Sequence, residues 1–325
     1  MFNDRKLIVG VGSALMDILA QEDDAFLEST GAAKGGMTLV ENGFIDDLMG
    51  RFSQKPSIVS GGSACNTVVG VGKLGGRARF VGKCGTDEFG RMFRQGLLDN
   101  GIEPTLFESR TPTGRVISII TPDAQRSMFT HLGASAETSP ADITAEVFSD
   151  AAVVHVEGYI LFNRDLMLAT LESAKKAGAK VSLDLASYTV VQESRDFLMS
   201  LLDRVDILIA NEDEAQAFTG HSDDAKAISA LAEHAEVAVL KVGPRGSYIA
   251  TEGKIARVEA QYGNPALDTT GAGDLWAAGF LYGLVNGLPV DKAGELGSAC
   301  GYEVCQVVGA CIPDTGWHNI RRILG

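Results

Sequence analysis

Short apolar runs alternate with longer amphipathic segments from about residue 151 onward. The apolar runs predict strands, and the amphipathic segments predict helices. This alternation is typical of a parallel sheet covered on both faces, in which ligands bind at the carboxyl ends of the strands. The expected strands are 152–157, 180–185, 206–210 and 237–242, and the expected helices are about 163–177, 192–202, 212–219 and 223–234.

The N-terminal half contains the same elements together with segments outside this alternation. Its expected elements are a buried strand at 7–12, a continued strand at 15–20, a short helix at 23–31, a strand at 34–40, a helix at 41–53, a strand at 79–82 and a helix over about 88–99. Residues 115–120 and 126–132 flank Pro122-Asp123-Ala124 and predict a hairpin that belongs to a separate small sheet. A second hairpin is expected over 247–260.

These patterns predict a single α/β domain over residues 1–325. We expect a mostly parallel central sheet flanked by helices, with a small β-sheet lid formed by segments of about 15–42 and 104–134. Such a lid would close over a substrate and exclude water.

Charge and cysteine content narrow the class of protein. Lys and Arg number 28 against 42 Asp and Glu, a formal net charge of −14, and no basic run indicates a nucleic-acid partner. No apolar stretch of about 18 residues predicts a membrane span, and no signal-type segment begins the chain, so we expect a cytoplasmic protein. The five cysteines include no C-x-x-C pair and predict buried free thiols: Cys65, Cys84, Cys300, Cys305 and Cys311.

The most informative stretch is Asp268-Thr269-Thr270-Gly271-Ala272-Gly273-Asp274, which leads into the apolar segment 275–281. Small residues at a helix start leave backbone N–H groups free, and the helix dipole makes them an anion site. Asp274 falls in the first helical turn, where a carboxylate can hold a hydroxyl group against a phosphoryl group in transfer. An Asp-capped core helix would have a similar sequence. A small-residue helix over 291–307 is placed to pack on it.

A glycine pair with a nearby asparagine, and a lone aspartate, provide further candidates in the N-terminal part of the chain. Gly61 and Gly62 precede a small-residue helix and would let a ligand approach the backbone, with Asn66 one turn into that helix. Tight helix packing explains the same residues. Asp17 is a lone carboxylate in an apolar run and requires a partner: a ligand hydroxyl, a backbone group or an arginine.

Three more candidates lie after strands or on the first hairpin. Asn211 and Glu214 share a helix face, and their oxygens suit Mg²⁺ or its water shell, although an Asn cap with a reciprocating Glu has the same spacing. Lys241-Val242-Gly243-Pro244-Arg245-Gly246 is a tight turn that can pass close to a nucleotide. Arg126 is the one cation on the return strand of the hairpin, where it is either exposed or able to reach a phosphate.

Two segments look like dinucleotide-binding fingerprints but do not fit one. Residues 10–15 lack the third glycine, and Gly70-Val71-Gly72-Lys73-Leu74-Gly75 lies at the end of a helix instead of between a strand and a helix. We therefore do not expect a dinucleotide-dependent oxidoreductase.

Together these motifs resemble the ribokinase/PfkB superfamily of ATP-dependent small-molecule kinases, in the same order and over nearly the whole chain. The DTTGAGD stretch is the most specific, followed by segment 61–67 with its downstream glycine pattern, and then by Asn211-x-x-Glu214. The downstream pattern consists of Gly82, Gly85, Asp87 and Gly90. Flanking segments such as 34–37 and 157–159 are most similar to the bacterial adenosine-kinase-like branch. The resemblance implies a ribokinase-like three-layer sandwich.

The resemblance also implies a role for each candidate, with ATP as phosphoryl donor and Mg²⁺ and K⁺ as metal ions. Asp274 would be the base that accepts or orients the acceptor hydroxyl. The transferred phosphoryl group would accept from the N–H groups of Gly271, Ala272 and Gly273, and the sugar hydroxyls would be bound by Asp17, Gly61, Gly62 and Asn66. Arg126 would contact the phosphates, Asn211 and Glu214 would hold hydrated Mg²⁺ near ATP, and Lys241, Gly243 and Gly246 would form the nucleotide turn. Asp268 and Thr270 would bind a monovalent cation, with Gly309 on its other side.

Lys241 departs from the family pattern, in which a Thr often begins the nucleotide turn, and a Lys would meet a phosphate as a point charge. The expected reaction is in-line transfer of the γ-phosphoryl group of MgATP to a primary hydroxyl, such as the 5′-hydroxyl of adenosine or a related nucleoside. Met37, Tyr159 and Phe162 are candidates for an apolar slot for the base, and packing explains them equally well.

Two other functions stay open. A free-sugar kinase for ribose, fructose or 2-keto-3-deoxygluconate would have the same catalytic motifs. A non-catalytic nucleoside- or nucleotide-sensing protein would have no need of a base such as Asp274 beside an anion site. In each case the partner is a small molecule, and we expect a monomer or a homodimer, with no nucleic acid or membrane partner.

Overall fold

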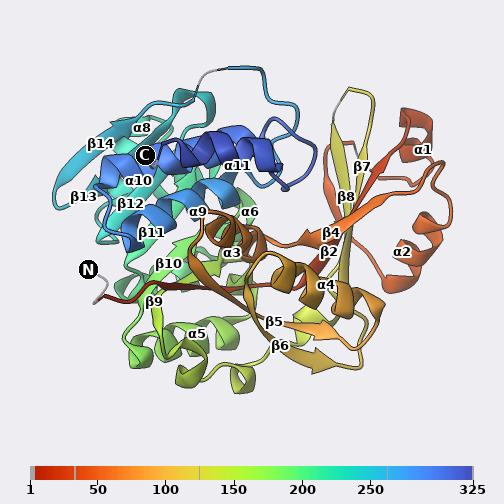
Figure 1. Cartoon of the computed structure of the whole chain (residues 1–325), viewed down its shortest axis with the longest axis horizontal. Helices are drawn as coiled ribbons and strands as arrows, with labels where there is room; N and C mark the ends of the chain where they lie inside the picture. Colours follow the sequence, from red (N-terminus) through yellow and green to blue (C-terminus); the bar gives the residue numbers. More distant parts are fainter. Residues whose placement is uncertain (1–3, 33, 124, 262, 324–325) are drawn as a thin grey trace.

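The computed structural model of the chain describes residues 4–32, 34–123, 125–261 and 263–323. Ala124, part of the predicted hairpin turn, lies outside the described residues. The chain forms a large α/β body, from one side of which a smaller β-rich lobe projects (Figure 1).

The large body is built on a nine-stranded sheet that is parallel from β12 through to β6. The hairpin expected over 247–260 extends this sheet in the antiparallel direction. In spatial order the strands are β14 (Lys254–Val258), β13 (Ser247–Thr251), β12 (Val237–Lys241), β11 (Ile207–Asn211), β10 (Lys180–Asp184), β9 (Ala151–Glu157), β1 (Leu7–Val11), β5 (Arg77–Gly85) and β6 (Glu103–Ser109). The predicted mostly parallel central sheet is confirmed.

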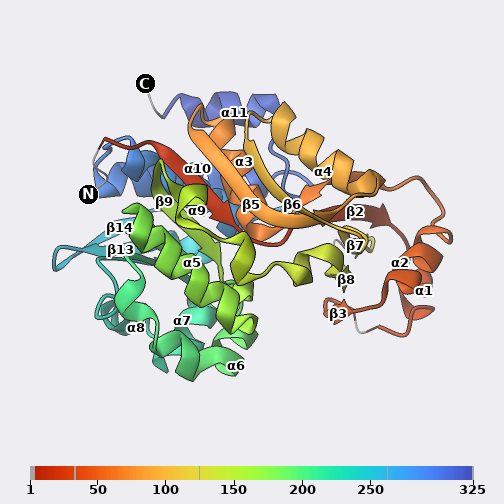
Figure 2. The same cartoon turned by 90° about the horizontal axis from the view of Figure 1, so that it is seen from below.

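Helices cover both faces of this sheet, as Figure 2 shows. Buried side chains along a strand alternate between the two faces: Ile207 and Ile209 contribute to one core, and Leu208 and Ala210 to the other. The first core also holds α3 (Ser63–Lys73), α4 (Glu88–Asp99), α9 (Ala272–Val285), α10 (Val290–Val304) and α11 (Asp314–Arg321). The second holds α5 (Arg164–Ala177), α6 (Tyr188–Met199), α7 (Glu212–Thr219) and α8 (Asp224–Leu231).

The small lobe consists of a five-stranded sheet and two helices. Its strands in order are β3 (Met37–Leu39), β8 (Arg126–His131), β7 (Gly114–Ile120), β2 (Leu15–Gln21) and β4 (Ser57–Gly61). Helices α1 (Asp24–Glu28) and α2 (Asn42–Met49) cover one face through a core that includes Ile18, Ile45 and Phe129. The separate small sheet expected around the first hairpin is therefore present.

The boundaries of the predicted lid need two corrections. Segment 104–109 belongs to β6 and pairs with β5 in the large sheet. Segment 57–61 is β4, an edge strand of the small sheet that pairs with β2. Both are half-buried edge strands, so their sequences lack the apolar run of a central strand. Strand 15–20 is also not a continuation of 7–12, because the chain turns after Val11 and enters the other sheet.

Asp87 anchors the chain where β7 enters the small lobe. Its carboxylate caps α4 by accepting the Gly90 N–H at 2.8 Å, and it accepts the Thr113 N–H at 2.9 Å and the Thr113 hydroxyl at 2.5 Å. A Cβ on Gly85 would lie 2.7 Å from both Thr111 O and Thr113 N. The Gly85-x-Asp87-x-x-Gly90 pattern therefore fixes the base of the lobe.

Other differences from the predicted elements have local causes. Strand 34–40 is shortened to β3 because Gly35 has φ +81°. Helix α6 begins earlier than expected because Ser187 accepts the Val190 N–H. The sequence did not predict α11 or six short 3₁₀ helices: η1 (Gly133–Glu137), η2 (Pro140–Asp142), η3 (Ala145–Phe148), η4 (Gly158–Phe162), η5 (Leu202–Arg204) and η6 (Gly243–Arg245).

The cysteines are all free, but not all are buried. Cys65, Cys84 and Cys300 are buried, Cys305 is half-buried, and Cys311 is exposed, which corrects the expectation for the last two. Within the described ranges, no helix has the length and apolar character needed to cross a membrane.

Candidate active site

Four adjacent parallel strands each end in a polar residue at the same edge of the large sheet. Glu157 ends β9, Asp184 ends β10, Asn211 ends β11 and Lys241 ends β12. The carboxyl edge of a parallel sheet is where ligands bind, and rigid strand ends hold side chains in place. This row therefore forms one wall of the candidate site.

The N-terminus of α9 has free backbone N–H groups where the sequence predicts an anion site, with one difference in which groups are free. Gly271 is its N-cap in the left-handed region at φ +72°, and no side chain caps the helix. The Ala272 N–H, one of the three expected donors, is directed to Thr269 O at 3.1 Å. Among the described residues, no hydrogen-bond partner is found for the N–H groups of Gly271, Gly273 and Asp274. These three donors are available to an anion.

Two side chains from α3 hold the carboxylate of Asp274. Ser63 Oγ donates to Oδ1 at 2.7 Å and Asn66 Nδ2 donates to Oδ2 at 2.9 Å, while Thr67 Oγ1 donates to the Asp274 carbonyl at 3.1 Å. Burial raises the pKa of Asp274 above its usual value, and the Asn66 and Ser63 donors oppose the shift. A fixed carboxylate of raised basicity beside free N–H donors is suited to accept a proton.

Glu157 joins three elements beneath this carboxylate. It is buried, and it accepts the Ser13 N–H at 2.9 Å and the Ala64 N–H at 3.1 Å. Burial raises the pKa of Glu157 to about 7, although both N–H groups oppose the shift. Glu157 thereby fixes the start of α3, the helix that carries Ser63 and Asn66.

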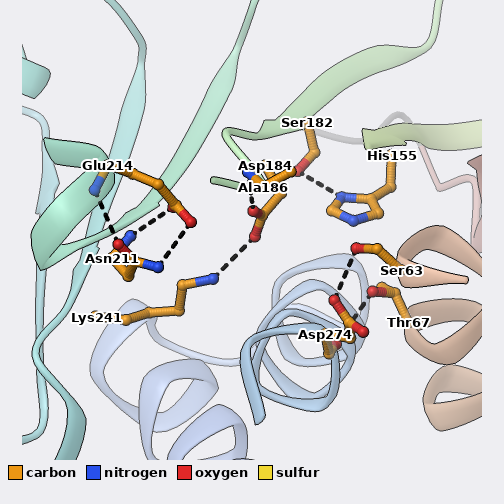
Figure 3. A network of polar contacts seen from close by, with 10 residues as sticks. All are labelled: Ser63, Thr67, His155, Ser182, Asp184, Ala186, Asn211, Glu214, Lys241 and Asp274. Carbon is orange, nitrogen blue, oxygen red and sulfur yellow. Dashed lines mark hydrogen bonds and ion pairs between the residues drawn. The ribbon is translucent and has the colours of Figure 1, made fainter. Parts of the chain in front are cut away.

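Lys241 extends along the strand ends to Asp184, as Figure 3 shows. The Nζ–Oδ2 distance is 2.9 Å. Asn211 and Glu214 lie beside this pair as a capping box: Asn211 Oδ1 accepts the Glu214 N–H, and Glu214 accepts from both nitrogens of Asn211. Burial, and then the Asp184 charge, raises the pKa of Glu214 to about 7. Asn211 and Glu214 therefore cap α7 and are also the two residues that the sequence singles out as candidate contacts for hydrated Mg²⁺.

Asp17 faces the site from the small lobe. Burial raises the pKa of its carboxyl to about 7, against the charge of Arg126. A Cβ on Gly61, in the neighbouring strand, would lie 2.3 Å from Asp17 Cγ. Within the described part of the chain, no side chain or backbone N–H is found to donate to this carboxylate, which leaves a ligand hydroxyl as a possible donor.

A cleft of about 450 Å³ separates β8 from the segment before α9, and its lining includes Arg126, Met128 and Asp268. Arg126 Nη1 lies 3.2 Å from Asp268 Oδ2, so the small lobe and the body are joined by an ion pair here. The Asp268 carboxylate also accepts the N–H groups of Thr270 and Gly309 and the Thr270 hydroxyl. Burial favours protonation, but these donors hold the pKa of Asp268 below its usual value.

Asp268, Thr270 and Gly309 therefore lie together as expected, but they do not fit a bound K⁺ in this arrangement. Both Asp268 oxygens are engaged, and the guanidinium of Arg126 provides the positive charge. The described residues also contain no cluster of three or more His, Cys, Asp or Glu side chains able to hold a metal ion. Any Mg²⁺ would depend on substrate phosphates and water for most of its ligands.

The candidates for an apolar slot are open to solvent. Met37 is 51% exposed on β3, Tyr159 is 43% exposed and Phe162 is 56% exposed on η4. Gly243 and Gly246 of the turn after β12 have φ of +53° and +95°, a conformation that favours glycine.

Sequence reasoning missed several residues of the site, among them Glu157, Asp184 and Ser63. Asp184 ends an apolar strand at the same edge as Asn211 and Lys241, and this position was the signal that could have identified it. Ser63 stands three residues before Asn66 on α3, and nothing in the sequence shows that both reach Asp274.

Comparisons with known proteins agree with this geometry. The sequence matches the pfkB family carbohydrate kinase over residues 40–315. It is 29% identical over 256 residues to a 5-dehydro-2-deoxygluconokinase of Geobacillus thermodenitrificans, covering 74% of this chain and 76% of that one. It is 29% identical over 264 residues to probable fructokinase-4 of Arabidopsis thaliana, covering 77% and 79%.

Solved structures resemble the whole chain. The adenosine kinase of Sinorhizobium meliloti is 32% identical with a TM-score of 0.88, covering 99% of this chain and 100% of that one. A probable sugar kinase of Rhizobium etli is 31% identical with a TM-score of 0.89, covering 99% of each chain. The chain belongs to the PfkB family of carbohydrate kinases and has the ribokinase-like fold. It is a sugar or nucleoside kinase that phosphorylates a hydroxyl group, with ATP as the family's phosphoryl donor.

Proposed function

We propose that this kinase transfers the γ-phosphoryl group of MgATP to the 5′-hydroxyl of adenosine or a related nucleoside. The observation that carries the chemistry is the Asp274 carboxylate, held by Ser63 and Asn66 beside the free N–H groups of α9. Similarity over 99% of the chain to a bacterial adenosine kinase supports the choice of acceptor.

In this proposal both lobes contribute to recognition of the acceptor. Asp17 on the small lobe and Asn66 on α3 bind sugar hydroxyls. Gly61 leaves the space that the Asp17 carboxylate occupies, and Gly62 would let the sugar approach the backbone at the start of α3. Asp274 accepts the acceptor proton, while the N–H groups of Gly271 and Gly273 stabilise charge on the transferred group. Tyr159 and Met37 line the space for the base, and the turn at Gly243 and Gly246 passes the nucleotide. Arg126 reaches the phosphates from the small lobe when it leaves Asp268.

Asn211 and Glu214 are the residues that would contact the water shell of Mg²⁺, because each oxygen in their capping box keeps a second lone pair. The ion would neutralise phosphate charge and orient the γ-phosphoryl group. We assign no residue to K⁺, and adding K⁺ to the assay tests whether turnover needs it. A cytoplasmic location would supply ATP.

A free-sugar kinase is the second candidate, because the curated relatives include a fructokinase and a 5-dehydro-2-deoxygluconokinase. ADP formation with MgATP across adenosine, inosine, guanosine, cytidine, ribose, fructose and 2-keto-3-deoxygluconate separates the two. We expect turnover with a nucleoside and none with ribose. Turnover with a free sugar alone would keep the mechanism and reject the nucleoside. ATP binding without turnover on any acceptor would favour a sensing protein.

The catalytic assignment has its own test in Asp274→Ala. Loss of a general base lowers turnover by about 10²–10⁴-fold, and we expect this fall in kcat with little change in ATP affinity. Asp291→Asn, in the first turn of the neighbouring helix α10, is the matched control and keeps full activity. Turnover of Asp274→Ala within a few-fold of the wild type would show that Asp274 is not the base.

A further inference from the structure

The ammonium group of Lys241 lies against the first turn of α9. A Cβ placed on Gly273 would be 3.0 Å from Lys241 Nζ, so the nitrogen borders the run of free N–H groups. In the proposed reaction, the transferred phosphoryl group would bind to these N–H groups and would therefore lie beside the Lys241 ammonium group. The inference developed here rests on that proposed function.

The contact between Lys241 and Asp184 spans an intervening strand. In the sheet, β11 lies between β12 and β10, and Asn211 at its end turns to Glu214 instead of to either neighbour. The side chains of Lys241 and Asp184 are only 13% and 7% exposed. Burying an ion pair rarely adds net stability, so stability alone does not account for this one.

The backbone after β10 is shaped to hold the Asp184 carboxylate. Asp184 Oδ1 accepts the Ala186 N–H at 2.9 Å while Oδ2 accepts from Lys241. Ala186 has φ +62°, a left-handed conformation that is unfavourable for a residue with a Cβ. The chain tolerates this strain in a turn that fixes the counterion of Lys241.

The charged side chains around Lys241 are acidic, so an anion can bind here only next to the lysine cation. Carboxylates approach it from three elements: Asp184 on β10, Glu214 on α7 and Asp274 on α9. His155 on β9 also lies near Asp184, but burial lowers the pKa of His155 to about 4, so it is neutral. Without Lys241, the four strand ends that form this wall would present the phosphates of ATP with carboxylates and the neutral amide of Asn211.

We propose that Lys241 is a catalytic residue that contacts the transferred phosphoryl group, and that Asp184 is the positioning residue that holds its ammonium beside Gly273. In the step itself, the acceptor oxygen forms a bond to the γ-phosphorus, and the bond from phosphorus to the β–γ bridging oxygen breaks. ADP leaves with that electron pair, and the acceptor proton passes to the Asp274 carboxylate. Lys241 keeps its protons and stabilises the equatorial oxygens.

Lys241→Met tests the first half, because it removes the charged amino group and keeps an unbranched side chain that is only one atom shorter. Removing one such donor lowers kcat by about 10²–10³-fold, and we expect this loss with ATP affinity, measured by equilibrium binding, within a few-fold of the wild type. An unchanged kcat would overturn the assignment. A loss of ATP affinity with kcat retained would also overturn it, since Lys241 would then bind only ground-state phosphates.

Asp184→Asn tests the second half with a pH profile. The Asn oxygen can still accept the Ala186 N–H, but the charge that raises the pKa of Lys241 against the effect of burial is gone. The lysine then loses its proton at a lower pH, so the alkaline limb of the kcat profile moves to lower pH. An alkaline limb in the wild-type position would reject a positioning role for Asp184, and a purely structural role would not move it.

A second lysine–aspartate pair in the same sheet provides the matched control. Lys180 at the start of β10 contacts Asp206 at 2.7 Å at the opposite edge of the sheet, so Lys180→Met keeps wild-type kcat and pH profile. Thermal unfolding and ATP binding confirm that each variant is folded. A wild-type protein without turnover on any acceptor would refute the proposed function itself, whereas an active wild type with an active Lys241→Met refutes only this inference.

Discussion

Missing side chains define this site at the residue level as much as the carboxylates do. A Cβ on Gly61 would lie 2.3 Å from the Asp17 carboxylate, and a Cβ on Gly12 would lie 2.2 Å from Glu157 Oε2. These distances are far below van der Waals contact, so each carboxylate occupies space that only glycine leaves open. Neither glycine has a positive φ, and the constraint is therefore contact with the carboxylate and not backbone conformation.

Gly61→Ala is expected to displace the Asp17 carboxylate without straining the backbone. If Asp17 binds the acceptor, the KM for the acceptor rises at least about 10-fold while the KM for ATP stays within a few-fold. Steady-state kinetics with each substrate varied in turn measures both. Gly43→Ala in α2 is the control, because no atom lies within 4 Å of its added Cβ. An unchanged acceptor KM in Gly61→Ala would place the acceptor away from Asp17.

The sequence predicts single site residues when a local pattern marks them. Asp274 follows a run of glycine and alanine, and Asn211 and Lys241 stand at the ends of apolar strands. A local sequence pattern therefore marks each of them as a candidate site residue. Asp184 ends an apolar strand in the same way, but its pairing with Lys241 spans two strands and has no local sign. Arg126 was expected at a phosphate but pairs with Asp268 across the two lobes. Such pairings depend on tertiary structure, which no local spacing contains.

At the level of elements, α9 and α10 approach each other at the backbone. A Cβ on Gly279 would lie 2.7 Å from Leu296 O and 2.8 Å from Gly297 N, and a Cβ on Gly283 would lie 2.8 Å from Ala293 Cα. The small-residue helix expected to pack on α9 does so, which confirms that prediction. Since α9 carries Asp274 at its start, this contact also sets how deep the Asp274 carboxylate lies in the body.

Gly279→Ala is expected to lower the free energy of unfolding by about 1–3 kcal/mol, because backbone atoms of α10 cannot move aside as a side chain can. Gly301→Ala on α10 is the comparison, since its added Cβ would meet Ala272 O at 3.3 Å, a contact that a small shift relieves. Urea unfolding of both variants measures the difference. Equal stability of the two would contradict the backbone contact as the cause.

Long elements with distinct boundaries in the sequence were mostly predicted, although α11 was missed, and short or edge elements were predicted less well. Helix α7 was predicted at its observed bounds and α5 within one residue. In each case an apolar strand comes before the helix and an Asn stands at its N-cap, so the start of the helix is distinct in the sequence. Strand β6 contains Pro104 and half-buried positions at an edge, and the short 3₁₀ helices between 133 and 148 follow turns instead of a helical period. Their positions result from packing against the sheet.

At the level of the whole molecule, three buried carboxyl groups connect folding to pH. Burial raises the pKa values of Asp17, Glu157 and Glu214 to about 7. Unfolded carboxyls are already ionised above about pH 6, so between pH 6.5 and 8 the folded state holds more protons than the unfolded state. Stability gained by a raised carboxyl pKa is present at low pH and is lost as pH rises through 7.

We therefore expect the free energy of unfolding to fall by about 2 kcal/mol from pH 6.5 to pH 8 in the protein without substrates. His155, with its pKa lowered to about 4, opposes this by about 0.4 kcal/mol, because unfolded His is half protonated at pH 6.5 and neutral at pH 8. Urea titrations at several pH values measure the slope. Asp17→Asn removes one of the three groups and makes the slope shallower, and a stability that rises over this range would refute the assignment.

Phosphoryl transfer and part of acceptor recognition are proposed for different sheets, and this arrangement has a consequence for how acceptor specificity evolves. Apart from Arg126 on β8, the residues proposed for phosphoryl transfer stand on the large sheet, α7 and α9. Asp17 and Met37, proposed for acceptor recognition, stand on the small lobe, whereas Asn66 and Tyr159 stand on the large body. Mutations in the small lobe can therefore change the acceptor while the transfer machinery is inherited unchanged. This gives a physical reason why chains 29–32% identical to this one have names as different as adenosine kinase, fructokinase and 5-dehydro-2-deoxygluconokinase.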